Sequence, residues 1–188
     1  SCPFIVVSNR EPYIHRLVDE EIQCFQPASG LTTGLGPVLQ ASGGVWVAQG
    51  VGDADRLVVD AFNKVAVPPE SPKYTLKRVW LDEQEERGFA DGLSNDALWP
   101  LCHIAYTRPI FRETDWTAYQ EANHVFAASV LEEVSDGAAF VFIQDYHFSM
   151  LSRYLKEQRP SILTAHFWHI PWPNPETFRV CPWQEETL

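Results

Sequence analysis

Cysteine is scarce in this sequence, and its spacing fits neither a metal site nor a cross-linked fold. The four cysteines, Cys2, Cys24, Cys102 and Cys181, lie far apart and form no CxxC pair. Zinc sites need closely spaced ligands, and a domain of 188 residues does not need disulfides for stability. We therefore expect no metal site, and we interpret the cysteines as reduced thiols of a cytoplasmic protein.

Long apolar runs and positive charge are also in short supply. No run approaches the roughly 20 residues of a membrane-spanning helix, and the apolar start, Cys2–Val7, lacks the basic flank of a signal peptide. The chain has 14 Lys and Arg against 25 Asp and Glu, a formal net charge of −11. Such a charge disfavours nonspecific binding to nucleic acid or anionic membranes. We expect neither as a partner, although a local basic pocket is compatible with the total.

The apolar residues that are present, 45% of the chain, predict one packed α/β domain. Short apolar runs rich in β-branched and aromatic residues are typical of buried parallel strands. Weaker runs at 45–48 and 74–80 predict further strands, and 65–67 predicts an edge strand. Three strong runs end beside a charged or titratable residue: Phe4–Val7 before Arg10, Ala138–Ile143 before Asp145, and Ile162–Phe167 before His169.

Helices and loops connect these strands. The polar stretch Glu11–Asp19 is expected to be a flexible excursion. Phe89–Asn95 is expected to be a loop, because Gly88 and Gly92 interrupt any helical pattern. Apolar residues at helical spacing predict helices over 30–41, 114–134 and 146–159.

Asp145 and His169 follow two consecutive strands that a predicted helix joins, which is the pattern of a parallel βαβ unit. Parallel strands end at one edge of the sheet, and open α/β sheets bind ligands beyond that edge. Prolines at 171, 173 and 175 then take the chain out of the sheet. The pattern predicts a ligand site there, although Asp145 could equally cap the next helix.

Other candidates each have an ordinary alternative. Arg10 has a planar donor fork that suits phosphate, or it caps a surface loop. Ser29 and Gly30 open a helix whose backbone N–H groups can hold phosphate, or they form a plain N-cap. Their loop matches neither the P-loop nor GxGxxG. Trp99, beside Pro100, is either a sugar-stacking platform or simple packing.

Six segments carry a more specific signal when they are taken together. They are VVSNR (Val6–Arg10), SGL (Ser29–Leu31), GGVW (Gly43–Trp46), LSNDALWPLCH (Leu93–His103), QDYHF (Gln144–Phe148) and FWHIPWPNPETFRVCPW (Phe167–Trp183). In this order and across the whole chain they resemble the trehalose-6-phosphate synthase family, retaining glycosyltransferases of GT-B architecture (glycosyltransferase family 20). The resemblance implies that residues 1–188 are the N-terminal, acceptor-binding, Rossmann-like domain, a parallel sheet flanked by helices, without the C-terminal nucleotide-sugar domain.

The resemblance also implies a reaction: glucose passes from a nucleotide sugar, such as UDP-glucose, to glucose 6-phosphate, giving trehalose 6-phosphate. Asp145 and His169 would position the substrates rather than attack them. No cofactor is implied beyond the donor substrate, a homo-oligomer is compatible, and the isolated fragment is expected to be inactive. The implied roles are acceptor-phosphate binding by Arg10, an acceptor-pocket wall by Trp99, hydrogen bonds to acceptor hydroxyls by Asp145, an approach to the donor diphosphate by Ser29 and Gly30, and a hydrogen bond at the reacting centre by His169.

Three departures from the family pattern leave the acceptor open. Ser29-Gly30 stands where the family has two glycines, and Ala48-Gln49 replaces a second tryptophan. Phe89–Asn95 replaces a YYxxFSN-like run, whose tyrosine contacts the acceptor phosphate. The alternatives are a glucosylglycerol-phosphate synthase, a relative with an REPY-like start such as Arg10–Tyr13, and a non-catalytic sugar-phosphate-binding module.

Overall fold

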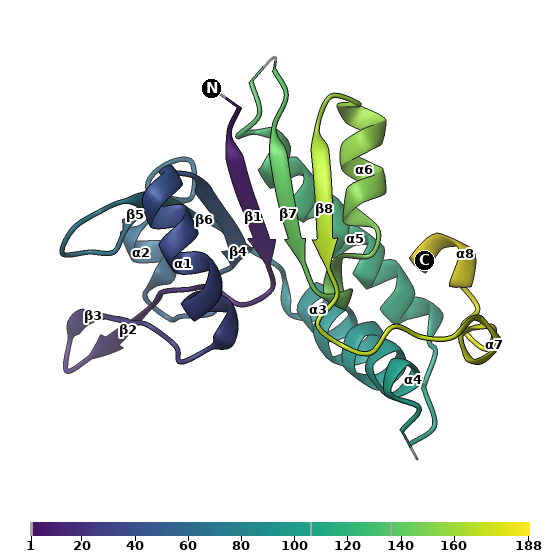
Figure 1. Ribbon diagram of the computed structural model, residues 1–188. Coiled ribbons are helices and arrows are strands. Elements are labelled where there is room, and N and C mark those ends of the chain that lie inside the picture. Colours follow the sequence, from purple (N-terminus) through teal and green to yellow (C-terminus); the bar gives the residue numbers. More distant parts are fainter. Residues whose placement is uncertain (1, 106, 136) are drawn as a thin grey trace.

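A mixed sheet with helices on both faces organises the chain, as the computed structural model shows for residues 2–105, 107–135 and 137–188 (Figure 1). Within these residues the sheet has six strands in the order β5-β6-β4-β1-β7-β8. All neighbours pair in parallel except β5, which is an antiparallel edge strand, as its sequence predicted. The expected α/β, Rossmann-like class is confirmed. The strands are β1 (Phe4–Ser8), β4 (Val45–Gln49), β5 (Lys64–Val67), β6 (Tyr74–Val79), β7 (Phe140–Gln144) and β8 (Leu163–Phe167).

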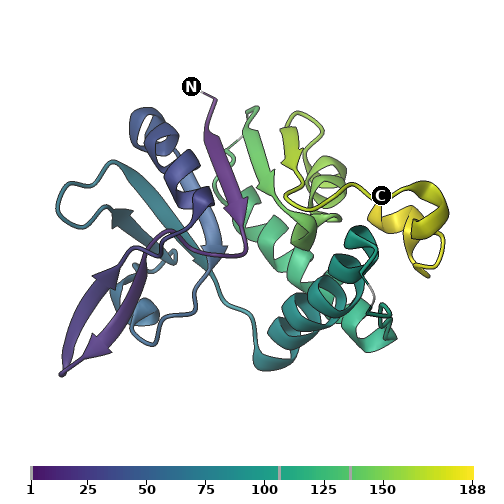
Figure 2. The same cartoon turned by 60° about the horizontal axis from the view of Figure 1, so that its bottom comes forward.

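Side chains alternate between two cores, one on each face of the sheet. On the central strand β1, Ile5 and Val7 join the core that α5 (Glu113–Leu131) and α6 (Leu151–Gln158) cover. Val6 points the other way, with its register partner Trp46, into the core under α1 (Gly30–Ser42). Figures 1 and 2 both show α1 on the face opposite α5 and α6. This period-2 pattern explains why β1 reads as a continuous apolar run.

The expected loop at Phe89–Asn95 is wrong, because this stretch lies inside a long helix. The helix begins as α3 (Glu83–Glu86), widens into the π-helix η1 (Arg87–Leu98) and ends as α4 (Trp99–His103). The Trp99 N–H bonds the carbonyl of Ser94, five residues back. The π-helical turn is rare and recurs at functional sites, and here it places Asn95 beside the cleft described below.

The prediction that Glu11–Asp19 is a flexible excursion is also wrong. The chain forms a hairpin of β2 (Ile14–Val18) and β3 (Glu21–Phe25). Its first strand is bound to the main domain, because the backbone N–H of His15 donates to the Asp55 carboxylate at 2.7 Å. Asp55 belongs to α2 (Asp55–Val58), which follows β4.

Two helix boundaries differ from the sequence prediction. The helix expected over 146–159 is split into a 3₁₀ turn, η2 (Tyr146–Phe148), and α6. The helix expected over 114–134 is α5, which ends at Leu131. Two short helices, α7 (Pro175–Phe178) and α8 (Gln184–Thr187), complete the described chain.

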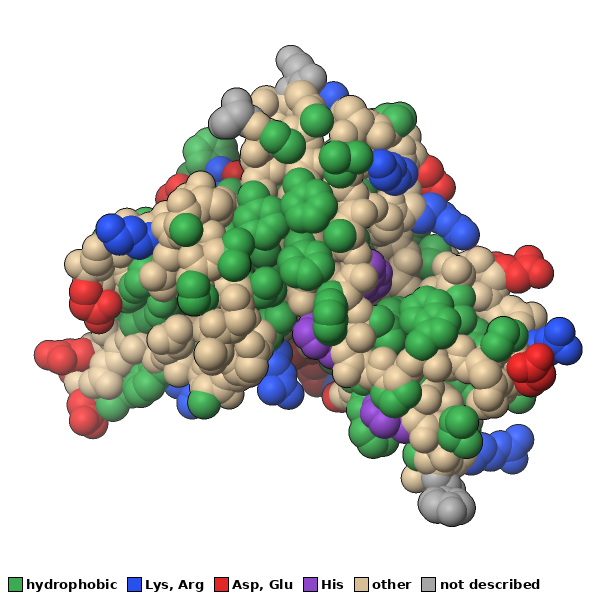
Figure 3. All heavy atoms as spheres, in the orientation of Figure 1, with side chains coloured by type: hydrophobic (Ala, Val, Ile, Leu, Met, Phe, Trp, Pro, Cys, Tyr) green, Lys and Arg blue, Asp and Glu red, His purple; other side chains and the backbone are tan. Residues whose placement is uncertain are grey.

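Aromatic side chains gather on β1 and β7, on the same face of the sheet as α1. Phe4 and Phe140 stack with ring centroids 5.8 Å apart, and Phe142 follows Phe140 at 6.5 Å. Figure 3 shows this apolar area in the middle of the molecule. Phe142 and the half-exposed Phe167 carry it into the cleft at the strand ends, so the cleft has an apolar wall as well as polar groups.

Candidate functional site

A cleft of about 810 Å³ lies at the carboxyl ends of β1, β7 and β8, against the N-terminal end of α1. Five of the residues predicted from the sequence line it: Arg10, Ser29, Gly30, Asp145 and His169. They come from four separate parts of the chain and meet because the strands are parallel. This volume is typical of a small-molecule site.

Trp99 is the predicted site residue that the cleft does not include. It is 43% exposed, and its ring stacks on His103 with centroids 4.0 Å apart. The lining of the cleft comes instead from Asn95, one turn earlier in the same long helix. A role for Trp99 as an acceptor wall therefore stays a prediction.

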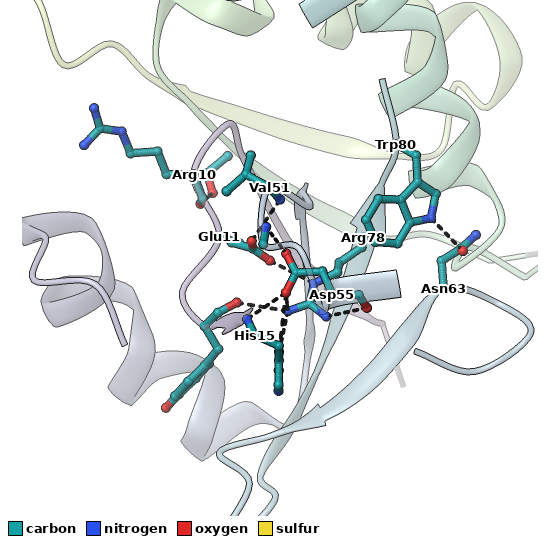
Figure 4. A network of polar contacts seen from close by, with 11 residues as sticks. Arg10, Glu11, His15, Val51, Asp55, Asn63, Arg78 and Trp80 are labelled. Atoms are coloured by element: carbon teal, nitrogen blue, oxygen red, sulfur yellow. Dashed lines mark hydrogen bonds and ion pairs between the residues drawn. The ribbon is translucent and has the colours of Figure 1, made fainter. Parts of the chain in front are cut away.

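Arg10 presents a free cation at the rim of the cleft. Its backbone carbonyl is held by the Ser8 hydroxyl at 2.6 Å, and the Trp46 indole donates to that hydroxyl at 2.7 Å. Its side chain is exposed, and no ion pair or hydrogen bond engages it among the described residues. In Figure 4 the Arg10 guanidinium points away from the buried network next to it. The backbone is thus fixed while the donor fork is available.

Asp145 combines an unusual backbone with several hydrogen bonds. Its φ of 74° and ψ of 172° fall in a region that only glycine adopts easily, at a cost of about 1–3 kcal/mol. Its Oδ1 accepts from the backbone N–H of Tyr146 at 3.0 Å and of His169 at 3.2 Å. Its carbonyl accepts from His166 Nε2 at 2.7 Å. Asp145 therefore caps η2 and also lines the cleft, and its role in binding a ligand stays a prediction.

The ring of His169 is oriented by its neighbour on β7. Its Nε2 lies 2.9 Å from Oε1 of Gln144. Because that oxygen only accepts, Nε2 carries the proton, and in the neutral ring Nδ1 is an acceptor. The amide nitrogen of Gln144 is buried without a hydrogen-bond partner among the described residues. Gln144 lines the cleft, so the lining contains a buried amide donor without a partner among the described residues.

Sequence reasoning missed two cleft residues that follow Asp145. The Tyr146 hydroxyl donates to Asn95 Oδ1 at 3.1 Å, and burial raises the pKa of Tyr146 to about 12, so it stays protonated. Burial lowers the pKa of His147 to about 4, with Arg10 acting in the same direction and Asp145 opposing it. His147 is therefore neutral at pH 7, and its Nδ1 is buried without a partner within the described chain. The QDYHF segment was the available signal.

The N-terminal end of α1 is suited to an anion. Ser29 caps the helix by accepting from the Thr32 N–H at 3.1 Å, and the first turn contains no acidic residue. A Cβ added at Gly30 or Gly34 would meet nothing within 4 Å, so packing does not demand glycine there. The open space faces the cleft, where helix N–H groups and the helix dipole favour negative charge.

The described residues offer neither a metal-binding cluster nor a membrane-spanning helix. No three His, Cys, Asp or Glu side chains gather there as a metal ion would require. No helix there combines the length and the apolar character that crossing a membrane demands.

Comparisons with known proteins agree with this geometry. The family model "Glycosyltransferase family 20" matches residues 3–188. The chain is 34% identical over 187 residues to a trehalose-6-phosphate synthase of Mycobacterium ulcerans, covering 98% of this chain and 36% of that protein. A trehalose-6-phosphate synthase of Mycolicibacterium vanbaalenii is 32% identical over 186 residues, covering 98% and 37%. The chain thus spans about a third of the length of these relatives.

Solved structures give the same result. An Escherichia coli structure described as bound with UDP-2-fluoro glucose matches with a TM-score of 0.75 and 26% identity, covering 97% of this chain and 36% of that one. A UDP-forming trehalose-phosphate synthase of Burkholderia xenovorans matches with a TM-score of 0.76 and 26% identity, covering 100% and 36%. With a family model that matches nearly every residue, this chain belongs to glycosyltransferase family 20.

Proposed function

We propose that this chain is the N-terminal, acceptor-binding domain of a GT-B retaining glycosyltransferase. The whole enzyme would transfer glucose from UDP-glucose, or a similar nucleotide sugar, to glucose 6-phosphate and give trehalose 6-phosphate. The observation that carries the proposal is the convergence of Arg10, Asp145 and His169 on one cleft at the carboxyl edge of the sheet. Membership of family 20 supports the reaction class.

Arg10, Tyr146 and Asp145 are suited to an acceptor that has a phosphate at one end and hydroxyls along its length. The free guanidinium of Arg10 can bind phosphate through two parallel hydrogen bonds. The Tyr146 hydroxyl donates its one proton to Asn95 Oδ1, so in the same cleft it can accept a hydrogen bond from a sugar hydroxyl. Asp145 uses Oδ1 for backbone N–H groups, which leaves its other oxygen to accept from a sugar hydroxyl.

The donor would approach from the α1 side, with its diphosphate near Ser29 and Gly30. In the reaction the bond between the glucose C1 and the diphosphate oxygen breaks, and the diphosphate leaves with the electron pair. A new bond forms from C1 to the acceptor hydroxyl oxygen, and the acceptor proton passes to the leaving diphosphate. Asp145 and His169 then act by holding hydroxyls in place, which lowers the barrier through orientation and preorganised dipoles. The nucleotide sugar is a substrate, and the proposal requires no further cofactor.

This chain forms one wall of the cleft, and the opposite side is open to solvent. The relatives are almost three times as long as this chain. We therefore expect no turnover by the 188-residue chain alone. Turnover would refute the dependence on a second domain. A cytoplasmic location and a homo-oligomeric state stay predictions.

A different acceptor is the second candidate, and one observation favours it. At the start of the run that replaces the family's tyrosines, Phe89 is fully buried in the core and Ala90 packs against it. Neither offers a hydroxyl to a phosphate, so the acceptor pocket is altered. Glycerol 3-phosphate, as in a glucosylglycerol-phosphate synthase, is the alternative acceptor. A non-catalytic sugar-phosphate-binding module would show binding without any reaction in the full-length protein.

Isothermal titration calorimetry on the chain tests the proposal, with glucose 6-phosphate, glycerol 3-phosphate and glucose as ligands. Arg10→Ala is expected to weaken the binding of glucose 6-phosphate about tenfold or more, because a charge-assisted hydrogen bond contributes about 1.5–3 kcal/mol. The matched control is Arg159→Ala, an exposed arginine after α6, at the opposite edge of the sheet. Equal affinities for the two variants would show that Arg10 does not bind the phosphate. A wild-type preference for glycerol 3-phosphate would select the second candidate.

A further inference from the structure

Directly after Arg10 the chain enters a buried ionic network (Figure 4). Arg78, on β6, has no exposed side-chain surface, and neither do the two carboxylates that it contacts. Its Nε lies 2.8 Å from Glu11 Oε2, and its Nη2 lies 2.7 Å from Asp55 Oδ1. One arginine thus serves two buried acids, and one of those acids is the residue that follows Arg10 in sequence.

The same groups hold the backbone of two neighbouring segments. Glu11 Oε1 accepts from the Val51 N–H at 3.1 Å, in the loop that follows β4. Asp55 Oδ2 accepts from the Gly52 N–H at 2.6 Å. Arg78 Nη2 donates to the Tyr13 carbonyl at 3.1 Å. The segment that leaves β1 is therefore tied by polar contacts to the carboxyl ends of β4 and β6, the same edge of the sheet at which the cleft opens.

Burial shifts the pKa values of several groups in the network. Burial, together with hydrogen bonding to Asp55, raises the pKa of Glu11 to about 8, while Arg78 opposes the rise. His15, which faces Arg78 from β2 at 2.8 Å, has its pKa lowered by burial and by Arg78, so it is neutral and accepts from the guanidinium. Tyr13 and Cys24 are the remaining titratable neighbours, and burial raises the pKa of each. At neutral pH burial therefore favours the protonated form of Glu11.

A buried ionic network of this kind contributes little net stability compared with apolar packing of the same volume, since desolvation offsets the attraction. What it does supply is direction, because each hydrogen bond fixes an angle as well as a distance. This control of direction matters for Arg10, because its side chain has no partner of its own among the described residues. Its carbonyl is held on one side by Ser8, and its C-terminal neighbour is held by Arg78.

We propose that Glu11 is a positioning residue for Arg10, acting through its contacts with Arg78 and the Val51 N–H. The inference deepens the proposed function and rests on its assignment of Arg10 to the acceptor phosphate. Glu11 touches no ligand in this scheme. It fixes the backbone from which the guanidinium reaches the phosphate, so its loss selectively weakens ligands that carry a phosphate.

The test compares three variants with the wild type by hydrogen exchange and by ligand binding. Glu11→Ala is expected to speed amide exchange in residues 9–13 and to weaken the binding of glucose 6-phosphate about tenfold. Glu11→Gln, which keeps the shape and the neutral state, is expected to retain both properties. Glu133→Ala is the matched control, because Glu133 is a largely buried acid that pairs with Lys64 and Lys77, outside the Glu11–Arg78 network. It should lower stability without changing exchange in residues 9–13.

If Glu11→Ala does not fold, Glu11→Asp takes its place, since it keeps the carboxyl but shortens the side chain by one methylene. Unchanged exchange in residues 9–13 of Glu11→Ala (or of Glu11→Asp in its place), or an equal change in Glu133→Ala, would overturn the inference. If the wild-type chain does not bind glucose 6-phosphate, the proposed acceptor function fails, while the exchange data still decide whether Glu11 orders the Arg10 segment.

Discussion

Replacing Glu11 with glutamine is expected to flatten the pH dependence of this protein's stability. The folded chain holds the Glu11 proton up to a pKa of about 8, whereas a free glutamate loses it near 4.5. Between these values the folded state binds more protons than the unfolded state, so the free energy of unfolding falls as pH rises. Below pH 4.5 the effect is absent, and above pH 8 it is complete.

The size of the effect follows from the same two values. At about 1.4 kcal/mol per pKa unit, the rise from 4.5 to about 8 corresponds to at most about 5 kcal/mol of lost stability. A test between pH 5 and pH 8 covers only part of this range, so the observed loss will be smaller, about 2–4 kcal/mol. In Glu11→Gln nothing titrates at this position, and this contribution disappears.

Urea unfolding of the wild type and of Glu11→Gln at pH 5, 6.5 and 8 measures the difference. We expect the two proteins to be closest in stability at pH 5, and the variant to gain on the wild type by about 2–4 kcal/mol at pH 8. Taking the difference between the two cancels every other group that titrates. A difference that stays constant from pH 5 to pH 8 would mean that Glu11 is ionised in the folded protein, and the reasoning about its burial would be refuted.

Three further substitutions follow from the site geometry. Asp145→Gly should be more stable than Asp145→Ala by about 1–2 kcal/mol in urea unfolding, because only glycine accepts a φ of 74° without strain; equal stabilities would mean that no strain is stored there. Gly30→Ala should leave the melting temperature unchanged or raise it slightly, since a Cβ there meets nothing, and a clear fall would show that the fold itself needs this glycine. Trp46→Phe removes the indole donor to Ser8 and should cost about 1–3 kcal/mol in unfolding free energy; a neutral effect would show that this hydrogen bond does not hold the loop.

The strands and the position of the site could be predicted from the sequence because both depend on local patterns. A buried parallel strand is apolar on both faces, so β1 and β7 were visible as short apolar runs. The residues that follow such strands meet at one edge for any parallel order. Arg10, Asp145 and His169 could therefore be grouped without knowing which strand neighbours which.

The long helix from α3 to α4 could not be predicted because its glycines act through tertiary contacts. A Cβ at Gly88 would lie 2.5 Å from that of Ala118, and one at Gly92 would collide with the Asp115 carboxylate. Both glycines let η1 approach α5 closely, and nothing local distinguishes that role from a loop. The position of Trp99 outside the cleft could not be predicted for the same reason, since its direction depends on the π-helical turn before it.

The hairpin was missed because its polar residues are paired with partners far away in the sequence. Glu11 and His15 look like solvent-exposed positions until Arg78, more than 60 residues later, is placed beside them. Arg78 and Lys77 are charged residues within the apolar run 74–80, yet both are buried and ion-paired. Long-range charge pairing leaves no periodic signal, so only the structure reveals it.

Amide chemical shifts of the ¹⁵N-labelled chain, recorded during a titration with glucose 6-phosphate, test whether one pocket holds the acceptor. If Arg10, Asp145 and His169 share that pocket, their signals and that of Tyr146 move together and saturate at one dissociation constant. Arg10→Ala should then abolish the shifts for glucose 6-phosphate at the same ligand concentration. Shifts that appear elsewhere while these residues stay unmoved would contradict the proposed acceptor site.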